Sequence, residues 1–103
     1  MPSGSSSAWR DHVRHFQREL QESRGLAPLK ELCKFLLDED HSLHETAEVI
    51  EYLQDFISVD MVHYEFHRKW AERMPQMNRL LEQEQREMEK LTELIQALME
   101  VEG

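Results

Sequence analysis

The sequence predicts an all-α fold, a small helical bundle of four or five helices with a long C-terminal helix. Only three glycines and three prolines interrupt the 103 residues, and apolar side chains recur at helical spacing through almost the whole chain. No segment alternates between apolar and polar residues as a half-buried strand would. Because a chain of this length forms one domain, we expect a disordered leader over 1–7 and a single helical domain over 8–103.

The first predicted helix runs from about residue 8 to residue 23, with Ser7 as its N-cap. Its apolar residues form one stripe on an otherwise polar surface, namely Trp9, Val13, Phe16 and Leu20. His12 lies at the edge of this stripe and His15 points away from it, so both are expected at the surface. Gly25 is the expected stop signal after the helix.

A second, shorter helix is predicted from Pro28 to about Asp38, because proline suits the first turn of a helix. The residues that face inward are Leu29, Leu32, Cys33 and Leu36. Cys33 lies within this stripe, so we interpret it as a small buried hydrophobe rather than a reactive thiol. A single cysteine also excludes an internal disulfide and favours a reducing, cytoplasmic compartment.

The acidic segment 38–45 has the carboxylates of a calcium-binding loop but not the spacing. An EF-hand loop needs Gly at its sixth position and Glu at its twelfth, where this chain has Leu43 and Val49. Ser42 and Glu45 instead have the spacing of a capping box, which predicts a helix start.

The third predicted helix, about 43–57, directs apolar side chains to the core and polar side chains to solvent. The expected core residues are Leu43, Ala47, Ile50, Leu53 and Ile57, and the expected outer residues are His44, Glu48, Glu51 and Asp55. Between 35 and 60 the chain holds eight acidic residues and no Lys or Arg. This acidic face is either a solvated surface or a docking surface for a basic partner.

A helix break is predicted near 58–60. On a helical wheel the apolar stripe of 43–57 and that of Val62, Phe66, Trp70 and Met74 differ by about 100°. A continuous helix would also place Asp60 inside the apolar stripe, which is unfavourable for a carboxylate. We therefore expect Asp60 or Ser58 to cap a fourth helix over about 61–73.

The last predicted helix follows Pro75 and covers about 76–101, a length of about 39 Å. Such a helix must overhang the shorter helices or cover two of them, so we expect self-association through its exposed end. Met77, Met88 and Met99 recur at intervals of eleven and fall on one line, which indicates either core packing or an adaptable apolar groove for a partner helix.

Four residues on two helices form the clearest polar constellation. His63 and His67 lie on the apolar face of the predicted fourth helix, which predicts that both are at least half buried, and Glu84 lies in the apolar stripe of the last helix. In an antiparallel hairpin about Pro75, facing residue numbers sum to roughly 150. His67 then faces Glu84, and His63 faces Glu87.

Three interpretations of this constellation remain open. The first is a His–Glu pair that sets the register of the hairpin. The second is a divalent transition-metal site with His63, His67, Glu84 and Glu87 as ligands. The third is a protonation switch, because histidine titrates near neutrality.

The net charge of the chain makes some classes of partner unfavourable. With 12 Lys and Arg against 21 Asp and Glu, the net charge of -9 disfavours nucleic acid and anionic membranes as partners. No apolar run approaches the roughly 20 residues of a membrane span, and no phosphate loop or catalytic motif is present, so we expect neither a membrane protein nor an enzyme. The charge is also polarised, since Arg68, Lys69 and Arg73 form a basic edge apart from the acidic face.

We therefore expect a regulatory adaptor, a protein–protein interaction module that forms homo-oligomers and binds a basic or amphipathic helical segment. The expected partner-binding residues are Glu45, Glu48, Glu51, Asp55, Met77, Met88 and Met99. The alternative is a metal-binding helical bundle that stores or senses an ion through the His/Glu cluster.

Overall fold

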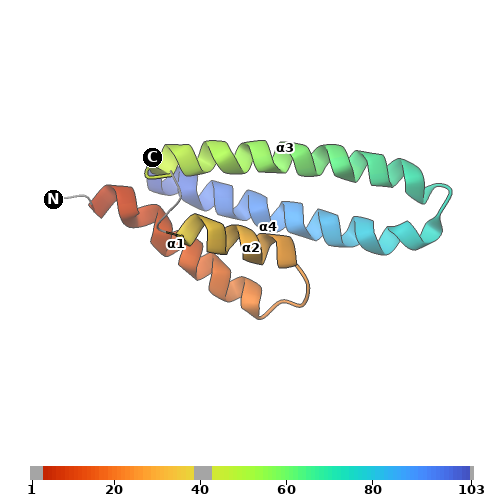
Figure 1. Cartoon of the computed structure of the whole chain (residues 1–103), viewed down its shortest axis with the longest axis horizontal. Helices are drawn as coiled ribbons and strands as arrows, with labels where there is room; N and C mark the ends of the chain where they lie inside the picture. The colour runs from red at the N-terminus through yellow and green to blue at the C-terminus, as the bar shows by residue number, and fades with distance from the viewer. Residues whose placement is uncertain (1–3, 39–42, 103) are drawn as a thin grey trace.

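The computed structural model describes residues 4–38 and 43–102, which form four α-helices and one 3-10 turn and contain no strand. In chain order the elements are α1 (Gly4–Gln21), α2 (Ala27–Leu37), α3 (Thr46–Ala71), η1 (Pro75–Met77) and α4 (Asn78–Glu102). Helices α3 and α4 form a long antiparallel hairpin, and α1 and α2 pack against only one end of it (Figure 1). The molecule therefore measures 57 × 25 × 25 Å, and the expected all-α fold with a long C-terminal helix is confirmed.

The first two helices present the predicted apolar stripes. All eight of the predicted inward residues of α1 and α2 are buried, Cys33 among them. Helix α1 begins at Gly4, four residues before the expected start, so Ser7 lies inside the helix and is not its N-cap. Residues 1–3 of the expected leader lie outside the described residues.

The connection between α1 and α2 uses two consecutive residues with positive φ. Gly25 has a φ of 81°, which glycine adopts without steric cost, and Leu26 follows with a φ of 58°. The Leu26 side chain is buried in the core, and this burial offsets the strain of a left-handed leucine. Pro28 then occupies the first turn of α2, as predicted.

The start of α3 differs from the predicted capping box. The helix begins at Thr46, with Glu45 as an N-cap residue whose side chain forms no capping hydrogen bond. Ser42 and His41 lie outside the described residues. The backbone N–H of His44 donates instead to a side-chain oxygen of Glu48 at 2.8 Å. A carboxylate in the first turn of α3 therefore accepts a hydrogen bond from a backbone N–H just before the helix.

The predicted break at 58–60 is wrong, because α3 runs without interruption from Thr46 to Ala71. The Ser58 hydroxyl donates back to the carbonyl of Gln54 at 3.0 Å and caps nothing. Asp60 occupies the inner side of a continuous helix, half-buried against α4. The helical wheel predicted a break because the largest apolar side chains of residues 61–73 were expected to face the core, whereas Val62, Phe66 and Trp70 are exposed.

The α3–α4 interface follows a regular spacing of three and four residues. On α3 its residues are Ile50, Leu53, Ile57, Asp60, Tyr64, His67 and Ala71, all buried or half-buried. On α4 they are Leu81, Glu84, Met88, Leu91, Ile95 and Leu98, which are also buried or half-buried. We refer to these two rows as the seam. Because α3 is as long as α4, it is the whole hairpin, and not α4 alone, that extends beyond the shorter helices (Figure 1).

The hydrophobic core lies at the end where all four helices meet. Trp9, Leu53 and Leu98 are fully buried there, and the Trp9 indole N–H donates to the carbonyl of His44 at 3.3 Å. Val49 takes the core position that the sequence assigned to Ala47, which is exposed. In the distal half of the hairpin, residues 58–88, α3 and α4 pack on each other through the seam, and the α1–α2 connection reaches α4 there, where Gly25 borders a hollow with Arg79 and Gln83.

Candidate protein-interaction surface

The seam contains a polar pair at its distal half. The Nδ1 of His67 on α3 lies 2.9 Å and 3.0 Å from the two carboxylate oxygens of Glu84 on α4. A carboxylate accepts hydrogen bonds, so the ring nitrogen donates. The side chains are 28% and 18% exposed, which places the pair between the helices and not on the surface. The predicted His67–Glu84 contact is confirmed, and with it the register of the hairpin.

Two further carboxylates lie beside this pair. Burial raises the pKa of Asp60, the charge of Glu84 raises it further, and nearby His63 opposes both effects. Burial also raises the pKa of Glu87, and the charges of Asp60 and Glu84 act in the same direction. Asp60, Glu84 and Glu87 therefore share a partly buried strip of the seam, in which nearby carboxylates make ionisation of Asp60 and Glu87 less favourable.

The other half of the predicted constellation does not form. His63 is exposed rather than half-buried, and its ring lies 6.4 Å from the ring of His67, measured between centroids. Across residues 4–38 and 43–102, no group of three or more His, Cys, Asp or Glu side chains is arranged to hold a metal ion. The geometry therefore does not favour the metal-binding alternative with His63, His67, Glu84 and Glu87 as ligands.

The largest apolar side chains of the distal half of α3 point away from the seam. Val59, Val62, Phe66 and Trp70 are 56%, 68%, 57% and 48% exposed, although the sequence suggested that the last three face the core. The arrangement is inverted relative to an ordinary amphipathic helix, since Asp60 and His67 lie inside and these four residues lie outside. Trp70 also borders a surface hollow of about 590 Å³ beside the α3–η1 connection.

The same surface of α3 carries acidic residues at one end and basic residues at the other. Its residues recur every three or four positions and are all exposed, in the order Glu48, Glu51, Asp55, Val59, Val62, Phe66 and Lys69, and Arg73 continues the row in the turn directly after α3. We call these eight residues the outer face of α3. The predicted acidic face is thus the first part of a longer strip that becomes apolar and then basic. Glu45 is also exposed and precedes it.

The three methionines of the predicted groove do not line one groove. Met88 borders a hollow of about 530 Å³ between α3 and α4, together with Met61 and Ile57. Met77 is half-buried in the 3-10 turn, and Met99 is 44% exposed near the end of α4. Only Met88 and Met99 belong to α4, since Met77 lies in η1 before that helix begins.

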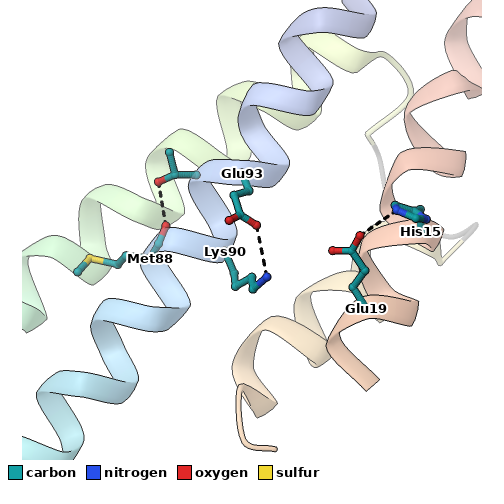
Figure 2. Close-up of polar contacts among 6 residues, drawn as sticks. His15, Glu19, Met88, Lys90 and Glu93 are labelled. Carbon is teal, nitrogen blue, oxygen red and sulfur yellow. Dashed lines mark hydrogen bonds and ion pairs between the residues drawn. The ribbon is translucent and has the colours of Figure 1, made fainter. Parts of the chain in front are cut away.

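The remaining described histidines lie at the surface, as expected. His12, His15 and His44 are exposed. Figure 2 shows His15 beside Glu19 on α1, where Nε2 and a carboxylate oxygen are 2.8 Å apart, and Lys90 beside Glu93 on α4. Both pairs join residues within one helix, so neither links two elements of the bundle.

Comparison with known proteins assigns no relative. No family model, curated protein or solved structure matches this chain. Among the described residues, no helix is both long enough and apolar enough to cross a membrane.

The sequence contains a pattern that predicts the outer face, but a helical wheel of the apolar residues alone does not reveal it. The row of alternating three- and four-residue steps in α3 continues through Asp60 and His67, and α4 has a matching row through Glu84. Following these rows would have assigned Val62 and Phe66 to the outside. The rows are hard to recognise because they contain polar residues, whereas a helix–helix interface is expected to consist of apolar residues.

Proposed function

We propose that this chain is a protein-interaction module that binds an amphipathic helix along the outer face of α3. The observation that carries the proposal is the exposure of Val62, Phe66 and Trp70 on the outer side of one regular helix. Contiguous exposed apolar residues with an aromatic centre are typical of protein-binding surfaces. The flanking charges supply orientation, since the helix that binds must present basic groups to the acidic end.

A short apolar stretch between charged ends also indicates how specificity arises. Phe66 and Trp70 provide rigid contact area, and burial of such side chains dominates many interfaces. Glu51 and Asp55 at one end, and Lys69 and Arg73 at the other, disfavour a helix bound in the reverse direction. The proposal involves no catalytic step, in keeping with the absence of a catalytic motif from the sequence.

The test is site-specific photocrosslinking in the native host, followed by binding measurements with purified proteins. A photoreactive residue at position 66 is expected to capture a specific protein. The matched control is the same residue at position 11, because the Asp11 side chain is 81% exposed and lies on a different helix, α1. Capture at both positions, or at neither, contradicts the proposal.

Binding measurements with purified proteins then distinguish a specific binding surface from non-specific adhesion. Phe66→Ala is expected to weaken the affinity for the captured protein by 10-fold or more, about 1.4 kcal/mol, as central aromatic residues commonly do. Asp11→Ala, on α1, is expected to leave the affinity unchanged. Equal affinities for the two variants would show that the outer face of α3 is not the binding surface.

A further inference from the structure

The outer face of α3 is complementary to itself when a second copy is laid on it in the opposite direction. Val62 lies near the middle of its apolar part. If a two-fold axis passes beside Val62, facing residues have numbers that sum to 124, as in any antiparallel pair of helices. Asp55 then faces Lys69 of the other copy, and Glu51 faces Arg73 of the other copy.

We propose that the outer face of α3 binds the outer face of α3 in a second copy of this chain, antiparallel and related by a two-fold axis at Val62. This inference rests on the proposed function, and it identifies the amphipathic helix that binds as α3 itself. A closed two-fold pair uses the same surface on both partners, so it stops at a dimer.

Charge complementarity selects this partner and this direction. In the antiparallel arrangement the acidic end of each face meets the basic end of the other, which produces four oppositely charged pairs. In a parallel arrangement Glu51 and Asp55 would meet the same residues of the other copy, and like charges would repel.

Among the described residues, the four charged side chains of these proposed pairs form no ion pair within their own chain. Arg68 points to the other side of α3, where its guanidinium donates to Glu65 at 2.8 Å. Among the residues that the structure describes, Lys69 and Arg73 receive no such partner, and neither do Glu51 and Asp55. All four are exposed and free to pair with a second copy.

The net charge of the chain restricts where a second copy can approach. The chain as a whole has a charge of -9, so two copies repel each other at most orientations. The distal half of the hairpin is nearly neutral, since 58–88 contains five Lys and Arg against six Asp and Glu. Contact through this half therefore brings two acidic molecules together at the least electrostatic cost.

The first experiment is sedimentation equilibrium on the purified full chain over a range of concentrations. Wild type is expected to shift with concentration from 12.4 kDa towards twice that mass. Val62→Glu places two like charges on the axis and is expected to abolish the shift, whereas Val59→Ala should only weaken it. Circular dichroism checks that each variant stays folded, which its exposure favours. A wild type that is monomeric at every concentration overturns the inference, and so does a dimer that persists in Val62→Glu.

Charge exchange tests which residues meet. Lys69→Glu/Arg73→Glu makes both ends of the face acidic, and Glu51→Lys/Asp55→Lys makes both ends basic, so each is expected to be monomeric alone and to form a one-to-one heterodimer when mixed. The quadruple variant reverses the polarity and is expected to restore the homodimer. A parallel pair would predict no restoration, and that result overturns the antiparallel arrangement.

A cysteine at the axis tests the symmetry directly. Val62→Cys is expected to form an intermolecular disulfide under mild oxidation, because each residue 62 faces itself. Wild type is the control, since its one thiol, Cys33, is buried. Cross-linking of Asp55→Cys to itself in preference to Val62→Cys would contradict the axis position.

These outcomes are separable from those of the proposed function. If the chain is monomeric but Phe66→Ala still weakens binding of a different purified protein, the interaction module stands and the second copy is excluded. If the chain dimerises through this face and photocrosslinking at position 66 captures only another copy, both proposals stand and the module is a dimerisation module.

Discussion

The imidazole of His67 on α3 and the carboxylate of Glu84 on α4 form a bifurcated hydrogen bond, in which both carboxylate oxygens lie within 3.0 Å of the one donor, Nδ1. The pair joins two helices at positions where a coiled coil usually has apolar residues. It fixes which residues of α3 face which residues of α4, because a shift by one turn would leave both polar groups partly buried without each other.

Removal of one partner is expected to cost more stability than removal of both. His67→Ala leaves a partly buried carboxylate without its donor and is expected to lower the free energy of unfolding by about 1–2 kcal/mol. The double variant His67→Leu/Glu84→Leu fills the seam with apolar groups and is expected to be at least as stable as wild type. Urea denaturation measures both. The control is His15→Ala, whose exposed partner Glu19 lies in the same helix, with an expected change below about 0.5 kcal/mol.

Asp60→Asn is expected to stabilise the protein at pH 7 but not in acid. Burial raises the pKa of Asp60, so the folded state holds this proton to higher pH than the unfolded chain does. The stability contributed by the protonated acid is complete below its ordinary pKa of 3.8 and is lost as the pH rises through the folded pKa. The asparagine variant avoids this loss. Because solvent screens a partly buried group, the gain at pH 7 is expected to be only about 0.5 kcal/mol.

Thermal unfolding from pH 3 to pH 8 measures this effect. The difference between the variant and wild type should grow with pH. Asp11→Asn, at an exposed position of α1, is the control and should show no such growth. A difference for Asp60→Asn that stays constant over this range would show that the carboxyl is not desolvated in the seam.

Leu98→Ala is expected to lower the free energy of unfolding by about 2–5 kcal/mol, because Leu98 is fully buried in the hydrophobic core and the substitution leaves a cavity. The neighbouring Met99 is 44% exposed, and Met99→Ala is expected to change stability by less than about 0.5 kcal/mol. Chemical denaturation measures both variants. Similar losses would mean that the end of α4 is not packed as described.

The thiol of Cys33 is expected to resist modification in the folded protein. Burial raises its pKa to about 11, so almost no thiolate is present at pH 8, and the sulfur is also shielded from reagents. Reaction with an aromatic disulfide reagent should be slow in buffer and fast in denaturant. Rapid labelling of the native protein would show that α2 separates readily from the core.

Much of the fold followed from local patterns. The stripes on α1 and α2, the position of Pro28 and the burial of Cys33 were predicted, because short helices that pack on one side show their packing face in their apolar residues. The helix boundaries near Gly4 and Thr46 were not, since weak capping signals compete with tertiary contacts at such ends.

The candidate site was predicted in part. His67 and Glu84 were paired correctly because two misplaced polar residues on facing helices could satisfy each other, and the turn at Pro75 set the sum of their numbers. His63 was misplaced with them. Its neighbours Phe66 and Trp70 were taken to mark the core, although they are on the outside.

The sequence by itself determined that this chain is helical, which stripes of α1 and α2 are buried, and that the hairpin pairs His67 with Glu84. Only the tertiary structure decided that α3 is continuous through Asp60 and that Val62 and Phe66 face outward. The physical reason is that periodicity indicates which residues share a face, whereas whether that face is covered depends on where the other helices pack. Helices α1 and α2 pack at one end of the hairpin (Figure 1) and leave the outer face of α3 exposed along its whole length, Glu48, Glu51 and Asp55 included.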